Sequence, residues 1–187
     1  PENIWEPAGI KNEKNNSENY FTGTFDGNGC SIFGLFVSET ERDYVGFIGY
    51  AHNAVIRNLG IENSYFETRG NYAGAVVGVF SSLANDRSEI YCCFARDNYI
   101  SANKFVGGFA GEIITINSTA KMNITNCYTS DSYIESFLGQ YVGGFSGLIQ
   151  SAGAYTLIRN CYSNNLIYIY ADEPIAAIFS GDIIRVN

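Results

Sequence analysis

The sequence predicts an all-β protein whose strands form a parallel β-solenoid of about five coils. Two observations predict this fold class. The chain is rich in β-prone residues, with fourteen Tyr and thirteen Phe, and it carries twenty Gly but three Pro and one Met, a composition that favours short strands joined by turns. It also repeats a strand-like segment at intervals of 34 residues without gaps. A unit of this kind cannot bury its apolar face alone, so it must stack on its neighbours.

The repeat is defined by isoleucines that share one column when its copies are aligned. Helical repeats also run near this period, but these segments lack the 3.6-residue apolar spacing of a helix. We therefore expect the isoleucine column to face the core as one strand of each coil. The aligned segments are AVIRNLGIENSYF (54–66), SEIYCCFARDNYI (88–100), MNITNCYTSDSYI (122–134) and TLIRNCYSNNLIY (156–168). The column is Ile32, Ile56, Ile90, Ile124 and Ile158.

An asparagine column follows the isoleucines and predicts a corner. Asn58, Asn126 and Asn160 occupy it, and Cys92 replaces asparagine in one copy. Asparagine tolerates the left-handed backbone conformation, and its amide can bond to the next coil. The next position is apolar again and must also face inward, which requires a bend. That second inward column is Leu59, Cys93, Cys127 and Cys161.

Paired glycines mark the place where one coil passes into the next. The phrase VGGFAG begins at Val106, and VGGFSG begins at Val142. Glycine allows a tight turn and a close approach of neighbouring backbones, where side chains would collide. The number of residues after this phrase varies between copies, so we expect surface loops there.

Length, charge and composition exclude several classes of protein. The 187 residues suffice for one domain, with residues 1–19 as a lead-in and 20–187 as repeats. A net charge of -8 lacks the basic surface that nucleic acid requires. No stretch is long and apolar enough for a membrane span, and no signal peptide is visible. We expect no cofactor and no metal site, because CxxC and Cys-His spacings are absent and the single His52 lies in a variable loop.

The order of these phrases resembles the GLUG-motif repeat family of bacterial surface proteins. The resemblance rests on FTGTFDGNGCSIFGL at 21–35, on the VGG phrase and on the I-x-N-C-Y phrase, and it covers nearly the whole chain. It implies a right-handed, secreted or wall-attached β-solenoid within a larger adhesin-like protein, with no catalytic residues to transfer. The chain departs from the pattern at Cys92 and at Ala176-Ala177, which stand where asparagine and the glycine pair are expected.

The five cysteines leave at least one thiol unpaired within the chain. Cys93, Cys127 and Cys161 share an inward column, and neighbouring strands lie about 4.8 Å apart, within reach of a disulfide. Side chains stacked in register meet the disulfide dihedral poorly, however. We therefore favour buried, reduced cysteines that pack as small hydrophobic residues.

Three sets of side chains are candidates for a site. Tyr65, Tyr99 and Tyr133 form a column that is either an outward stripe in contact with sugars or proteins, or a ladder that is buried in the core or partly covered, which we favour. Asp97 and Asp131 share a column with Asn63 and Asn165 and resemble a carboxylate pair, but a turn ladder explains all four. The sequence DGNG at 26–29 resembles the start of a calcium loop, although a hairpin-like turn explains it better.

These observations predict a non-catalytic structural or adhesive module that is extracellular or attached to the cell surface. Its expected partners are glycans or proteins of a host or cell surface. The first alternative is a subunit of a self-assembling filament or sheath that associates through the solenoid ends. The second alternative is a carbohydrate-active β-helix enzyme, which would need a cluster of acids on one outward face.

Overall fold

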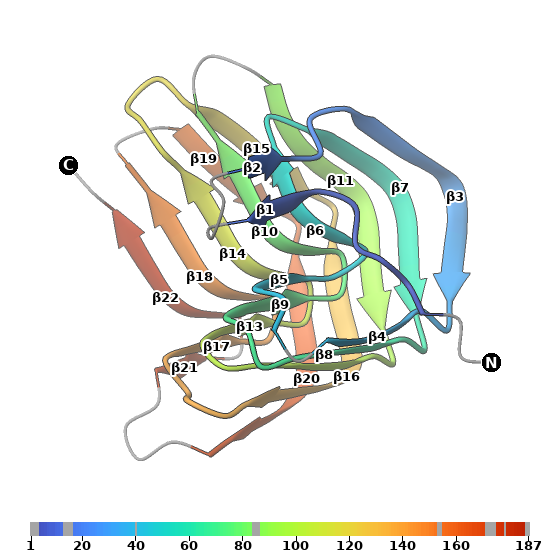
Figure 1. Ribbon diagram of the computed structural model, residues 1–187. Coiled ribbons are helices and arrows are strands. Elements are labelled where there is room, and N and C mark those ends of the chain that lie inside the picture. Colours follow the sequence, from blue (N-terminus) through green and yellow to red (C-terminus); the bar gives the residue numbers. More distant parts are fainter. Residues whose placement is uncertain are drawn as a thin grey trace.

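The computed structural model describes residues 4–12, 17–39, 41–83, 87–152, 155–170, 175–177 and 179–185. The regular elements in these ranges are β-strands. The described residues contain no helix that is long and apolar enough to cross a membrane. The repeats form one sheet of ten strands and two sheets of five, all paired in parallel (Figure 1). The all-β parallel solenoid predicted from the sequence is confirmed.

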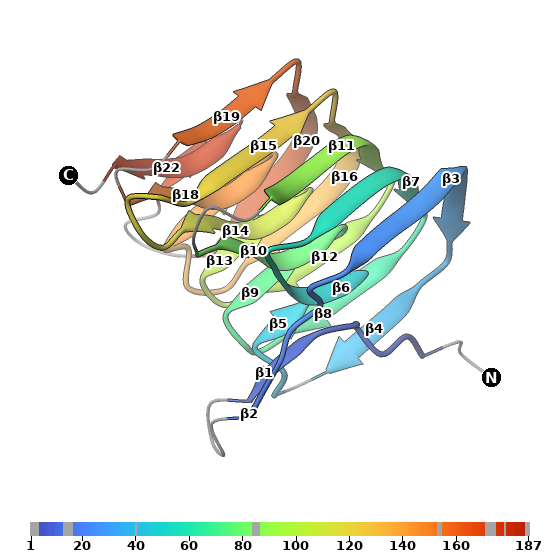
Figure 2. The same cartoon turned by 90° about the horizontal axis from the view of Figure 1, so that it is seen from above.

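Each coil supplies neighbouring strands to these sheets, and Figure 2 shows the first strands of successive coils side by side. Coil 1 contains β3 (Thr24–Phe33), β4 (Phe36–Glu39), β5 (Tyr44–Val45) and β6 (Ile48–His52). Coil 2 contains β7 (Val55–Glu62), β8 (Tyr65–Thr68), β9 (Tyr72–Gly74) and β10 (Val77–Ser82). Coil 3 contains β11 (Arg87–Arg96), β12 (Tyr99–Ala102), β13 (Phe105–Gly107) and β14 (Ala110–Thr115). Coil 4 contains β15 (Lys121–Thr125), β16 (Tyr128–Ser136), β17 (Tyr141–Gly143) and β18 (Ser146–Ser151). Coil 5 contains β19 (Tyr155–Arg159), β20 (Tyr162–Ile169), β21 (Ala176–Ala177) and β22 (Ser180–Arg185).

The core consists of like residues stacked on one another. Ile56 pairs with Ile90, Ile90 with Ile124, and Ile124 with Ile158, as the repeat predicts. The first three are fully buried. On the other side of the core, the Phe109 ring stacks on Phe145 with a centroid distance of 4.6 Å. Each inner coil therefore buries its apolar face against the coils on either side, and each end coil against its one neighbour.

The first coil does not follow the predicted register. Ile32 pairs with Ile61, and Phe25 instead lies beside Ile56. The cause is the corner at 27–29, where the pairing shifts between Asp26 and Cys30. Asn28 and Gly29, which have positive φ, carry the chain around this corner. The segments of β3 before and after the corner both pair in parallel with β7. The prediction that Ile32 belongs to the isoleucine column is therefore wrong, and the DGNG turn is not a hairpin.

The lead-in adds partial pairing to the open side of coil 1. Ile4 and Ala8 bridge to Phe36 and Ile48 in parallel. The Trp5 indole donates a hydrogen bond of 3.0 Å to the Phe47 carbonyl and stacks on its ring. Farther along the chain, before β3 begins, the strands β1 (Ile10–Asn12) and β2 (Ser17–Asn19) form an antiparallel pair. The lead-in thus covers parts of coil 1 while β3 stays at the edge of its sheet.

Glycine is required where the coil turns at the VGG phrase. A Cβ at Gly107 would lie 2.7 Å from the Phe145 carbonyl oxygen of the next coil. A Cβ at Gly74 would lie 2.5 Å from the Ala110 Cα. Such distances force backbone to move, because Cβ atoms do not approach backbone so closely. In coil 5, Ala177 pairs with Gly143 at this position.

Candidate functional site

The first corner is an asparagine ladder in the left-handed conformation. Asn58, Asn126 and Asn160 have φ values of 55°, 56° and 55°, and Cys92 adopts 54° at the same place. The Asn160 amide donates to the Asn126 side-chain oxygen at 3.1 Å. The residues predicted for this ladder therefore lie at the corner, and Cys92 interrupts the amide bonding.

Asp26 closes the first corner at coil 1. Its carboxylate accepts hydrogen bonds from the Asn58 amide at 3.0 Å, the Asn28 backbone N–H at 2.9 Å and the Arg57 guanidinium at 2.8 Å. These donors, the Asn58 amide foremost, lower the pKa of Asp26 below its usual range. The carboxylate that resembled the start of a calcium loop therefore serves the turn.

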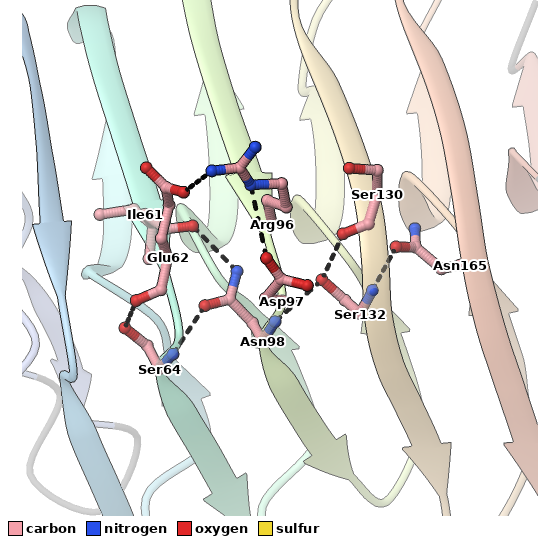
Figure 3. A network of polar contacts seen from close by, with 9 residues as sticks. All are labelled: Ile61, Glu62, Ser64, Arg96, Asp97, Asn98, Ser130, Ser132 and Asn165. Carbon is pink, nitrogen blue, oxygen red and sulfur yellow. Dashed lines mark hydrogen bonds and ion pairs between the residues drawn. The ribbon is translucent and has the colours of Figure 1, made fainter.

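The second corner contains a relay of hydrogen bonds that runs across the coils (Figure 3). The Ser64 N–H donates to the Asn98 side-chain oxygen at 2.9 Å, the Asn98 N–H to the Ser132 hydroxyl at 3.1 Å, and the Ser132 N–H to the Asn165 side-chain oxygen at 3.1 Å. The Leu35 N–H starts the series by donating to the Ser64 hydroxyl. Each coil thereby satisfies a backbone donor of the preceding coil, which fixes the register of the corner.

Left-handed residues precede this relay in three coils. Asn63, Asp97 and Asp131 have φ values of 48°, 57° and 57°. Asn165 does not join this column as predicted, because the pairing of β16 with β20 shifts between Ser130 and Tyr133. Asn165 instead takes the relay position opposite Ser132.

Ionic contacts engage the acids of the middle coils. Arg96 bonds to the buried Glu62 carboxylate and lies 3.4 Å from Asp97 (Figure 3). The Ser31 hydroxyl and then Arg96 lower the pKa of Glu62. Arg96 therefore lies between two carboxylates, and the exposed Asp97 has this cation beside it. Asp131 is the neighbour of Asp97 in the column and is exposed. The residue before Asp131 is Ser130, whereas the residue before Asp97 is Arg96.

The predicted tyrosine column lies on the outside of the coils. Its rings are near parallel, with centroid distances of 4.6 Å from Tyr65 to Tyr99 and 5.5 Å from Tyr99 to Tyr133. Phe36 stacks on Tyr65, and Tyr168 on Tyr133, at the two ends. The alignment of 122–134 with 156–168 without gaps predicts that Tyr168 shares the column of Ile134, and this is wrong, because Ile167 pairs with Ile134.

This stacking limits what the tyrosine column offers to a ligand. Tyr65, Tyr99 and Tyr133 each have an aromatic neighbour on both sides, so their faces are turned toward other rings rather than toward solvent. The Tyr65 hydroxyl donates to Glu67 at 2.6 Å. Burial and this bond raise the pKa of Tyr65 to about 12. The column presents ring edges and hydroxyls, and its role in binding stays a prediction.

The cysteine column lies inside the solenoid as free thiols. Cys93 and Cys127 are buried, and Cys161 is partly buried in coil 5. The hydrogen bond with Cys161 acts to lower the pKa of the Cys127 thiol, but contact with Cys93 and burial outweigh it and raise that pKa. Over the described part of the chain, no three His, Cys, Asp or Glu side chains cluster as metal ligands would.

The register shift opens a hollow on the outer surface between coils 4 and 5. It measures about 430 Å³ and is lined by Asp131, Ser132, Tyr133, Asn164, Asn165 and Leu166. Sequence reasoning missed this site because it aligned the repeats without gaps. The available signal was the apolar alternation of coil 5, where Ile167, rather than Tyr168, continues the inward column of Ile134.

Comparison with known proteins gives partial matches. No family model matches the chain. It is 35% identical over 78 residues to a "Putative Gly-rich membrane protein" of Evansella cellulosilytica, and 28% identical over 107 residues to "Halomucin" of Haloquadratum walsbyi. These matches cover 41% and 57% of the chain but 8% and 1% of the two relatives.

A solved structure with a similar course is the crystal structure of a "putative immunoglobulin A1 protease" from Bacteroides ovatus. The likeness covers 87% of this chain and 67% of that one, with a TM-score of 0.48 and 16% sequence identity.

Proposed function

We propose that this chain is a non-catalytic structural and adhesive repeat module of an extracellular, cell-surface protein of the GLUG-motif type. The observation that carries the proposal is the stacking of like residues through successive coils, in the core and in both corners. Such stacking makes a stiff, extended body whose sides display surface along its length. That form suits a module that projects a binding surface outward.

The chemistry of the corners supports a binding role over catalysis. A glycosidase needs two carboxyl groups that face a substrate, with separate tasks as acid and nucleophile or base. Asp97 is engaged by Arg96, Glu62 is buried against the same arginine, and Asp26 holds a corner. Both acids of the column that suggested a carboxylate pair are exposed, and Asp97 is in an ion pair with Arg96.

The relatives support a surface location. One is named as a membrane protein, and the chain matches a small share of each relative's length, as a module of a larger protein would. Glycans and surface proteins are the partners that this proposal implies. No cofactor is required for it.

An adhesion assay tests the proposal. Beads coated with the chain are expected to adhere under flow to surfaces carrying cell-envelope glycans or proteins, whereas uncoated beads wash away. The same protein incubated with polysaccharides and peptides is expected to release no product. Absence of adhesion on every surface contradicts the adhesive role, and product release that is lost in Asp131→Asn supports the enzyme instead.

Self-assembly is a second candidate that one observation favours. Large apolar side chains are exposed on coil 5, including Tyr155, Tyr162 and Leu166 at 59%, 54% and 56%. The lead-in opposes head-to-tail stacking, because it pairs with coil 1 where another coil would dock. Electron microscopy across a concentration series separates the candidates, since a filament subunit polymerises as concentration rises.

A further inference from the structure

The hollow between coils 4 and 5 exists because coil 5 lacks one residue at the second corner. Coils 2, 3 and 4 each place a left-handed residue there, at Asn63, Asp97 and Asp131. In coil 5 no such residue separates Asn164, the partner of Ser130, from Asn165, the residue opposite Ser132. Ser130 therefore pairs with Asn164, while Tyr133 pairs with Leu166, one position out of step. The space of the missing residue stays open.

The floor of the hollow is rigid. The Asn165 amide donates to the Gly144 carbonyl at 2.7 Å, and its oxygen accepts from the Ser132 N–H at 3.1 Å. These bonds tie the floor to the coil 4 backbone on both sides. The floor therefore keeps its shape when a ligand contacts the rim.

The rim of the hollow combines one acid, one amide and an apolar wall. Asp131 and Asn164 are exposed, and the Leu166 side chain is 56% exposed. Asp131 follows Ser130, so it lacks the adjacent arginine that pairs with Asp97. Within the described residues, no ion pair engages the Asp131 carboxylate. Its oxygens are available to accept hydrogen bonds from a ligand.

We propose that this hollow binds one neutral sugar unit of a glycan, a hexose or an N-acetylhexosamine. The hollow has a volume of about 430 Å³ and is largely open to solvent, so it suits contact with one sugar ring at the surface rather than enclosure of a ligand. Asp131 accepts hydrogen bonds from sugar hydroxyls, the Asn164 amide donates to a ring or hydroxyl oxygen, and Leu166 covers an apolar C–H face. The single carboxylate and the net charge of -8 disfavour sialylated or sulfated sugars.

This inference rests on the proposed adhesive function and names the site and ligand class behind it. A calcium ion is a poor alternative occupant, because it takes six to eight oxygen ligands and the rim offers one carboxylate. Tyr133 of the tyrosine column lines the hollow, but its ring faces are stacked against Tyr99 and Tyr168, which leaves the sugar contact to Asp131, Asn164 and Leu166.

The test begins with an array of immobilised neutral and anionic oligosaccharides, followed by calorimetry with the retained neutral sugar. One variant inserts an aspartate between Asn164 and Asn165, which restores the regular corner and occupies the place of the missing residue in the hollow. Another is Asp131→Asn, which keeps a residue that tolerates positive φ but removes the charged acceptor. Asp97→Asn is the matched control, since it makes the same change at a regular corner.

We expect the wild type and Asp97→Asn to bind a neutral sugar with equal affinity. Asp131→Asn should weaken binding at least tenfold, and the insertion should abolish it while the thermal midpoint holds or rises. Retention of no neutral sugar, or unchanged affinity in the insertion variant with an intact fold, overturns the proposal. If bead adhesion persists in either case, the adhesive function stands without this site. If beads coated with the wild type also fail to adhere, the proposed adhesive function fails together with the sugar site.

Discussion

Coil 3 and coil 5 carry nearly the same columns, yet their side chains lie in different environments. Ile90 and Cys93 in coil 3 are buried, whereas Ile158 and Cys161 in coil 5 are partly exposed. Coil 3 lies between two coils, and coil 5 packs against coil 4. The comparison teaches that burial in a solenoid comes from neighbouring coils rather than from the residue type. Identical substitutions should therefore cost different amounts in the two coils.

The largest difference is expected for truncation of the isoleucine column. Ile90→Ala should lower the free energy of unfolding by roughly 3–4 kcal/mol, because it leaves a cavity in a fully packed site. Ile158→Ala should cost about 1–2 kcal/mol, since its surroundings can relax and it buries less area. Urea unfolding followed by circular dichroism measures both. Equal losses would break the comparison.

A methyl group added to the turn should have the next largest effect. Gly107→Ala brings a Cβ against the Phe145 carbonyl of the following coil, and we expect a loss of about 1–3 kcal/mol. Coil 5 carries alanine at the equivalent Ala177, so Ala177→Gly should change stability by less than about 1 kcal/mol. Thermal unfolding of both variants supplies the measurement. A neutral Gly107→Ala would show that the coils are not in close contact there.

Acid should weaken the second corner of coils 2 and 3 more than that of coils 4 and 5. The folded-state pKa of Glu62 is lowered, so its contribution to stability is present above the unfolded-state pKa and is lost as pH falls through the folded one. Stability to urea should therefore decline below about pH 4.5. Glu62→Gln should flatten this decline, and hydrogen exchange should locate the loss near β7 and β11. An unchanged pH profile in Glu62→Gln would contradict the assignment.

The smallest effect is expected at the asparagine corner. Cys92 adopts a φ of 54° in coil 3, where coil 5 uses Asn160. Because asparagine tolerates this conformation better, Cys92→Asn should stabilise the fold by about 1 kcal/mol. It can also bond to Asn126 across the coils, as Asn160 does. Calorimetry measures the shift, and a destabilised variant would mean that the ladder does not govern this corner.

The regular part of this molecule could be predicted from its sequence. Like residues at a constant spacing predict parallel stacking, which the pairing of Ile90 with Ile124 bears out. The positive φ of Asn58 could also be predicted, because two adjacent inward positions require a bend. The tyrosine column was placed correctly as a column, but its stacked ring geometry required coordinates.

The irregular parts could not be predicted with the same rule. Ile32 was misplaced because an enlarged corner at 27–29 breaks the spacing in coil 1. The hollow was missed because coil 5 omits a corner residue, and an alignment without gaps assigns Asn165 to the wrong column. In both cases the inward side chains keep their stacking while the corner absorbs the change in length. Corners are therefore where sequence spacing fails and where a site can arise.

The central claim is that equivalent side chains of successive coils lie directly over one another. Methyl–methyl nuclear Overhauser effects in a sample with labelled isoleucines test it most directly. The structure predicts strong effects from Ile56 to Ile90 and from Ile90 to Ile124, with none from Ile56 to Ile124. A missing effect between Ile90 and Ile124 would contradict the stacked arrangement.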